Sequence, residues 1–188
     1  EIIDKHKQTK KPIVEMLFKD KKLTVIQKIT YAREILRRRA IRDGFDAILF
    51  LDLDTIPANK DAIQRLLSFN KDSITGLYYY KNSQVALIID NDTLTNMTND
   101  KIKNLVENEQ IITIAGSGYG CVLHQRLALG TPFDFDLFNG CNTDDFGHCE
   151  ALKQAGVKLW FDPFILCKHL NFSDPLDKFK KNLGIFAE

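Results

Sequence analysis

One nearly unbroken apolar run constrains the fold of this chain more than any other segment. It covers residues 45–51 (FDAILFL) and ends abruptly at Asp52-Leu53-Asp54. Runs of this kind are typical of strands that are covered on both faces, as in the parallel sheets of α/β proteins. We therefore expect a buried strand whose carboxyl end carries two acidic residues.

Helical and strand patterns alternate around that strand. Apolar residues recur at helical spacing over residues 25–42, and Gly44 ends this helix. Further elements are expected as helices over 59–69, 99–108 and 145–155, the last closed by Gly156, and as strands over 12–18, 73–80, 85–89, 111–115, 121–129, 157–161 and 164–167. The alternation predicts an α/β layer sandwich with a mostly parallel central sheet and flanking helices. Without a repeat or a linker, residues 1–188 are expected to form a single domain.

Composition limits the classes of binding partner and the cellular compartment that we expect for this chain. The 26 Lys and Arg residues against 25 Asp and Glu give a formal charge of +1, without the basic excess of proteins that grip nucleic acid. No apolar run is long enough for a membrane span, and no signal segment opens the chain. The four cysteines form no Cys-x-x-Cys pair, which favours free thiols over a zinc site. Together these features predict a cytoplasmic protein.

The acidic triplet after the apolar run is the first candidate site. In a strand, Asp52 and Asp54 project from the same face, and ligands of open α/β sheets bind beyond the carboxyl ends of strands. Such carboxylates can share a hard divalent cation, which in turn can hold a diphosphate. Two rival triplets are present, Asp90-Asn91-Asp92 and Asp134-Phe135-Asp136. The first is also explained by a turn between strands, and the second by a loop.

Other candidate groups follow later in the chain. Asp145, with Thr143 and Asp144 before it, starts a helix and is either a first-turn acid or a general base. His169 follows a strand and is either structural or a metal ligand. The glycines of residues 116–120 let backbone approach a ligand closely. Side chains for which a structural role is favoured are His124, His148, Tyr78, Tyr79, Tyr80, Trp160 and the arginines of residues 37–42.

Five short pieces, taken in order, resemble the GT-A glycosyltransferases, and within them the family-2-like inverting enzymes. They are YARE at 31–34, FDAILFLDLDTIP at 45–57, GSGYGCVL at 116–123, TDDFGHCEALKQAG at 143–156 and FILCKHL at 164–170. The resemblance implies metal-dependent transfer of a sugar from a nucleotide-diphosphate sugar to a hydroxyl group of a glycan, lipid or protein acceptor.

The resemblance also implies roles for single residues. Asp54 would ligate Mn²⁺ or Mg²⁺, Asp52 would reach the metal or the nucleotide ribose, and His169 would complete the coordination. Asp145 would be the catalytic base, and Arg33 would approach the nucleotide.

Gly118 and Tyr119 would lie near the donor sugar or the acceptor. Three features depart from the family pattern: the opening strand with its base-holding segment is not found, Asp144 replaces a glutamate, and His148 stands at an often aromatic position. Two alternatives therefore stay open, a retaining transferase on the same scaffold and a non-catalytic domain that binds nucleotides or carbohydrates.

Overall fold

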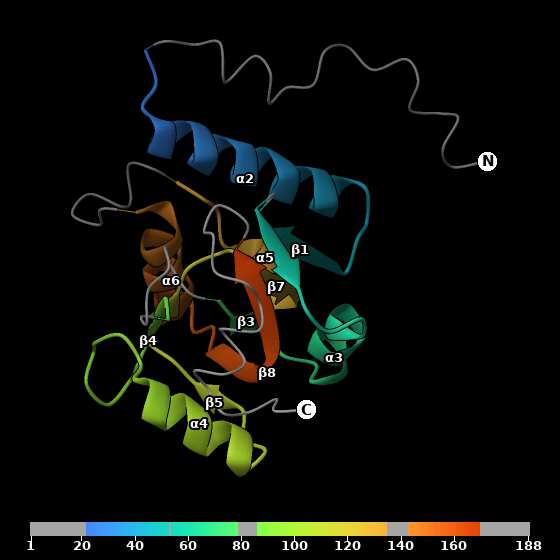
Figure 1. The fold of residues 1–188 in the computed structure, drawn as a ribbon. Coiled ribbons are helices and arrows are strands. Elements are labelled where there is room, and N and C mark those ends of the chain that lie inside the picture. Colours follow the sequence, from blue (N-terminus) through green and yellow to red (C-terminus); the bar gives the residue numbers. More distant parts are fainter. Residues whose placement is uncertain (1–21, 53, 79–85, 135–142, 170–188) are drawn as a thin grey trace.

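A mixed sheet with helices packed around it forms the centre of the protein (Figure 1). The computed structural model describes residues 22–52, 54–78, 86–134 and 143–169. Within these residues the sheet has the strand order β1-β7-β3-β8-β2, and β5 pairs with β8. Its strands are β1 (Ala47–Leu51), β2 (Thr55–Pro57), β3 (Ser73–Leu77), β5 (Ile112–Thr113), β7 (Cys121–Gln125) and β8 (Leu159–His169). A smaller sheet pairs β4 (Ile88–Ile89) with β6 (Gly116–Ser117). The helices are α2 (Val25–Arg42), α3 (Ala62–Ser68), α4 (Asn99–Glu107), α5 (Arg126–Gly130) and α6 (Asp144–Gln154).

The α/β class is confirmed, but the expected strand direction is wrong. In the larger sheet β3 and β8 are parallel, whereas the pairs β1–β7, β3–β7, β2–β8 and β5–β8 are antiparallel. The reason is the path of β7, which enters between β1 and β3 and runs opposite to both. An apolar run indicates that both faces of a strand are covered, but it does not indicate whether the neighbouring strands are parallel or antiparallel to it.

Two hydrophobic clusters cover the two faces of the sheet. Figure 1 shows α6 and α3 on opposite sides of the central strands. Along β1, Ile48 and Phe50 pack with one cluster and Ala47 and Leu49 with the other. This alternation follows from the two-residue period of a strand, and it explains why β1 has no polar face.

Helix boundaries follow the local signals closely. The helix α2 occupies Val25–Arg42 as expected, with a capping box between Thr24 and Gln27, and Gly44 beyond its end has φ +75°. Likewise α6 is closed by Gly156 at φ +79°. The strand β2 was not expected, because Pro57 suggested the start of a helix that in fact begins at Ala62.

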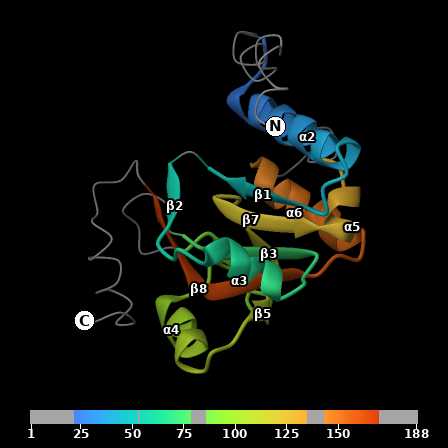
Figure 2. The ribbon, with the colours of Figure 1, turned by 90° about the vertical axis from the view of Figure 1, so that its right-hand side faces the viewer.

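The buried face of α2 is unusually polar. Arg33, Glu34 and Arg37 are buried together with Thr30 and Ala40, whereas Leu36 is 47% exposed. A surface helix normally turns its apolar stripe toward the core. Buried ionic side chains therefore need partners here, and these partners define the candidate site below. Figure 2 shows α2 lying beside β1, which is the edge strand of the sheet.

Three further expectations can be compared with the structure. Cys121, Cys149 and Cys167 are buried free thiols, as predicted. The expected strands over 157–161 and 164–167 are one continuous strand, β8. The predicted strand over 12–18 lies outside the described residues. Among the helices that the structure describes, none has the length and apolar character needed to cross a membrane.

A buried cluster of aromatic and histidine side chains predicts that the fold loses stability in acid. Burial lowers the pKa of His148 to about 4, although its bond to Thr131 opposes this shift, and burial lowers the pKa of His124 well below its usual value. Unfolded histidine binds a proton near pH 6.5, so the unfolded chain takes up more protons as the pH falls. From His148 alone we expect a loss of about 3 kcal/mol in the free energy of unfolding between pH 7 and pH 4.

Urea unfolding at pH 7, 5.5 and 4 measures this loss, and His124→Phe provides the comparison. Within the described residues neither ring nitrogen of His124 has a hydrogen-bond partner, so phenylalanine removes a proton acceptor without breaking a bond. The variant should show a shallower decline with falling pH. Equal declines for both proteins would contradict the role of His124.

Candidate functional site

A buried arginine joins two segments that carry predicted site residues. The Nη1 of Arg33 on α2 donates to Oδ2 of Asp144, at the start of α6, over 2.5 Å. Its Nη2 donates to Oδ1 of Asp52, directly after β1, over 3.4 Å. The side chains of Arg33 and Asp144 are 11% and 9% exposed, and that of Asp52 is 45% exposed. The bridge therefore has a buried end and an end open to solvent.

The charges around this bridge are mainly negative. Burial raises the pKa of Asp144 above its ordinary value, and Arg33 opposes that shift. Burial likewise raises the pKa of Asp52, and the nearby carboxylates of Asp54 and Asp145 add to the rise. Although burial works against a charged guanidinium, the attraction of Asp144 and Asp52 raises the pKa of Arg33. Three carboxylates, those of Asp144, Asp52 and Asp145, thus act on one arginine, and a fourth, that of Asp54, acts on Asp52. This excess of negative charge favours binding of a cation.

Asp52 and Asp54 lie in a turn, and the expectation that they share the face of one strand is wrong. The strand β1 ends at Leu51, and the N–H of Thr55 donates to the carbonyl oxygen of Asp52 over 2.9 Å. The N–H of Asp52 donates to the carbonyl of Gly120 over 3.2 Å, which ties the turn to the glycine loop. The chain must turn here because β2 begins at Thr55 and pairs with a different strand, β8. The two acids nevertheless remain close enough to interact electrostatically.

The backbone of His169 lies beside this acidic turn. In the antiparallel pair of β2 and β8, His169 stands opposite Thr55, the residue after Asp54. The side chain of His169 is outside the described part of the structure. Among the side chains that the structure describes, no group of three or more His, Cys, Asp or Glu residues could enclose a metal ion. The role of His169 as a ligand stays a prediction.

Asp145 lies next to the buried bridge but is itself half-buried. It occupies the first turn of α6, where its Oδ1 accepts the N–H of Phe146 over 2.9 Å. Its charge acts on both Arg33 and Asp52. Thr143 makes no side-chain cap bond, so this helix start does not have the ordinary threonine cap. Of the acidic pair, Asp144 is buried and pairs with Arg33, and Asp145 is the less buried acid.

The ring of Tyr119 packs against the guanidinium group of Arg33. Its side chain is 1% exposed, and the Arg33 guanidinium lies 5.2 Å from the centre of its ring. The hydroxyl of Tyr119 is 2.7 Å from Nδ1 of His148, whose Nε2 donates to the carbonyl of Thr131 over 3.1 Å. These contacts are with protein groups, so Tyr119 acts on the site through Arg33 in this structure.

Tyr78, for which a packing role was favoured over stacking on a sugar or base, explains two of the glycines of the 116–120 loop. A Cβ on Gly118 would lie 1.7 Å from the Tyr78 hydroxyl, and one on Gly120 would lie 2.9 Å from its ring. The buried tyrosine therefore occupies the space that the missing side chains leave. Burial, and then the charge of Asp145, raise the pKa of Tyr78 above its ordinary value. The sequence signal for this contact was the alternating glycine pattern of residues 116–120 together with an aromatic residue at the end of an expected strand.

The rival candidates have structural roles where the structure describes them. Both Asp90 oxygens accept from Lys101, and the N–H of Asp92 donates to Asp90 over 3.0 Å, as expected of a turn. Asp136 lies outside the described residues. His124 and His148 belong to the buried aromatic cluster, and Lys71 lies over the ring of Trp160.

Comparison with known proteins adds a likeness of fold. The protein titled A197 from STIV has a similar structure, with a TM-score of 0.53 and 18% sequence identity. The match covers 75% of this chain and 66% of that one. This likeness shows the fold alone. No protein-family model matches the chain, and no curated protein matches it either.

Proposed function

We propose that this chain is a GT-A-type glycosyltransferase that moves a sugar from a nucleotide-diphosphate donor to a hydroxyl acceptor. The observation that carries the proposal is the Arg33 bridge, which brings Asp52 beside Asp144 and hence beside Asp145. These residues come from three separate pieces of the sequence resemblance. Chance matches to weak motifs would have no reason to meet at one point of the fold.

The acidic turn supplies donor groups of the right chemistry for a divalent cation. Asp52 and Asp54 offer only oxygen atoms, and Mg²⁺ commonly takes one or two carboxylates together with substrate phosphates. The hydroxyl of Thr55, the residue that follows Asp54, is buried and has no hydrogen-bond partner within the described residues. Two mutually repelling carboxylates and an unused hydroxyl fit a site that a cation and a diphosphate complete. A bound Mg²⁺ or Mn²⁺ would supply charge neutralisation at the diphosphate.

The other steps of the proposed transfer depend on side chains of the chain itself. The carboxylate of Asp145 accepts the proton of the acceptor hydroxyl, whose oxygen forms a bond to the anomeric carbon of the donor. The bond from that carbon to the diphosphate breaks, and its electron pair leaves with the nucleoside diphosphate. Attack from the face opposite the leaving group inverts the anomeric configuration. Asp144 and Arg33 hold the start of α6 next to the acidic turn.

Thermal unfolding with a panel of nucleotide-diphosphate sugars, with and without Mn²⁺, tests the proposed binding. A donor present at a hundred times its dissociation constant should stabilise the fold by about 2.7 kcal/mol. For a chain of this size that stabilisation corresponds to a rise in Tm of about 5–10 °C. The rise should depend on Mn²⁺, and it should disappear in Asp54→Ala.

The rival triplet provides the matched control, since Asp92→Ala removes the last acid of another Asp-x-Asp and that side chain is 79% exposed. This variant should keep the full donor-dependent shift. The proposal fails if no nucleotide sugar raises the Tm, or if both variants respond alike. Where transfer is observed, NMR of the product anomer separates inversion from retention.

A further inference from the structure

A pocket beside α2, the helix that carries Arg33, has one wall formed by a single helical stripe. Tyr31, Glu34, Ile35 and Arg38 stand at positions i, i+3, i+4 and i+7 of α2, which place them on one face. Residues 132–134 form the opposite wall, and the pocket has a volume of about 450 Å³. Cavities of this size accommodate small organic ligands.

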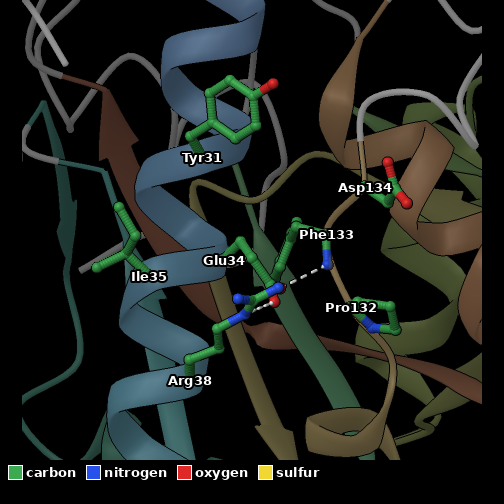
Figure 3. A pocket seen from close by; sticks show the side chains of 7 residues that line it. All are labelled: Tyr31, Glu34, Ile35, Arg38, Pro132, Phe133 and Asp134. Carbon is green, nitrogen blue, oxygen red and sulfur yellow. Dashed lines mark hydrogen bonds and ion pairs between the residues drawn. The ribbon is translucent and has the colours of Figure 1, made fainter.

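Glu34 is the fixed centre of this wall. Its carboxylate accepts hydrogen bonds from Arg37, from Arg38 and from the N–H of Phe133, as Figure 3 shows for the last two. The side chain of Glu34 is 9% exposed. Burial works against the charged form, but these hydrogen bonds lower the pKa of Glu34, so the carboxylate is ionised at neutral pH. With these donors engaged, Glu34 is an anchor for the arginine rather than a ligand group.

The guanidinium group of Arg38 is held through one nitrogen, and its other two nitrogens are available to a ligand. Its Nε donates to Oε1 of Glu34 over 2.6 Å, while its side chain is 75% exposed. The structure gives its two Nη groups no hydrogen bond within the described residues. An arginine fork recognises phosphate and carboxylate oxygens in a bidentate manner, and anchoring it in advance lowers the entropic cost of binding.

An apolar wall lies next to this fork. Arg38 reaches back along α2 to Glu34, which stands three residues after Tyr31 on the same helix. Tyr31 is 41% exposed, and Pro132 and the buried Phe133 line the other side. Figure 3 shows Tyr31 and Arg38 toward the two ends of the pocket along α2. A ligand that contacts both would need an anionic end and a flat apolar body.

We propose that this pocket binds a small molecule that carries an oxyanion, phosphate or carboxylate, on an apolar ring. Arg38 holds the oxyanion, and Tyr31 packs against the ring. The site is separate from the proposed transfer site because Arg33 points to Asp144 and Asp52, whereas Arg38 is held at Glu34. The proposal does not depend on the transfer reaction.

Isothermal titration with phenyl phosphate tests the site, followed by amide NMR shifts to locate it. Binding should shift the amides of Tyr31, Ile35 and Phe133, and Arg38→Gln should weaken it about tenfold or more, the loss of a charge-assisted contact. Tyr31→Ala should weaken phenyl phosphate but leave inorganic phosphate unchanged. A parallel titration with benzoate shows which oxyanion the fork prefers, and tighter binding of either oxyanion supports the site.

Arg42→Gln is the matched control, because it removes a second, 67% exposed arginine of the same helix that pairs with Asp43. Its affinity should stay within twofold of the original protein. Equal losses in both arginine variants would identify general charge attraction and overturn the proposal. Absence of millimolar binding, or shifts confined to α6, would also overturn it. Thermal unfolding of each variant confirms that the fold is intact.

Discussion

The Asp145→Asn variant should keep its fold and its donor binding, yet lose about 10²–10⁴-fold of its transfer rate, the range typical of a general base. The amide retains the size of the side chain but cannot take a proton from the acceptor. Asp145 is half-buried, and within the described part of the chain its side chain bonds only to the N–H of the next residue, so little stability depends on its charge. Initial rates with saturating donor, together with the Tm shift on donor binding, separate the two effects.

Asp100→Asn is the matched control for this substitution. Asp100 also lies in the first turn of a helix, α4, where a negative charge interacts favourably with the helix dipole. Its variant should lose no more than about 1 kcal/mol of stability and no activity. If Asp145→Asn retains turnover within a few-fold of the original protein, the base is another group. If it loses donor binding as well, the residue contributes to the donor site.

Arg33→Met should be the most destabilising single substitution in the candidate site. It leaves the carboxylate of Asp144 buried without its cation, and breaking a buried ion pair in this way costs about 3–5 kcal/mol. Methionine retains much of the volume of the side chain, so the loss measures the missing charge. Urea unfolding at pH 7 gives the change in free energy.

A double variant and a surface variant complete that experiment. Adding Asp144→Asn to Arg33→Met removes the unpaired charge and should restore a large part of the lost stability. Arg39→Met breaks an exposed pair with Asp43, with side-chain exposures of 48% and 30%, and should cost no more than about 1 kcal/mol. If Arg33→Met costs as little as Arg39→Met, the bridge contributes nothing particular to folding.

The sequence predicted local structure better than it predicted the assembly. Thr24, Gln27 and Gly44 set the limits of α2 through short-range bonds and a positive φ, and these signals are local. The direction of β7 depends on which strands it meets in space, and the apolar pattern of β1 is the same for either direction. The expected parallel sheet was therefore wrong for a reason that one sequence does not contain.

The candidate site shows the same division. Asp52, Asp54 and Asp145 could be identified because acids after a strand or at a helix start are visible in the sequence. The pairing of Arg33 with Asp144 spans 111 positions and could not be identified. The contact of Tyr78 with Gly118 could not be identified either, because it depends on the closeness of two segments about 40 residues apart in the sequence, and the pattern only favoured packing for Tyr78.

The way in which α2 is attached has a mechanical consequence. Apolar contacts tolerate sliding, because one methyl group replaces another at little cost. A helix fastened by Arg33, Glu34 and Arg37 to specific oxygen and nitrogen atoms of other segments has no second position one turn away that satisfies them. The same bonds that hold the helix therefore set the spacing between the acidic turn and the start of α6, so any motion that opens this spacing must first release α2.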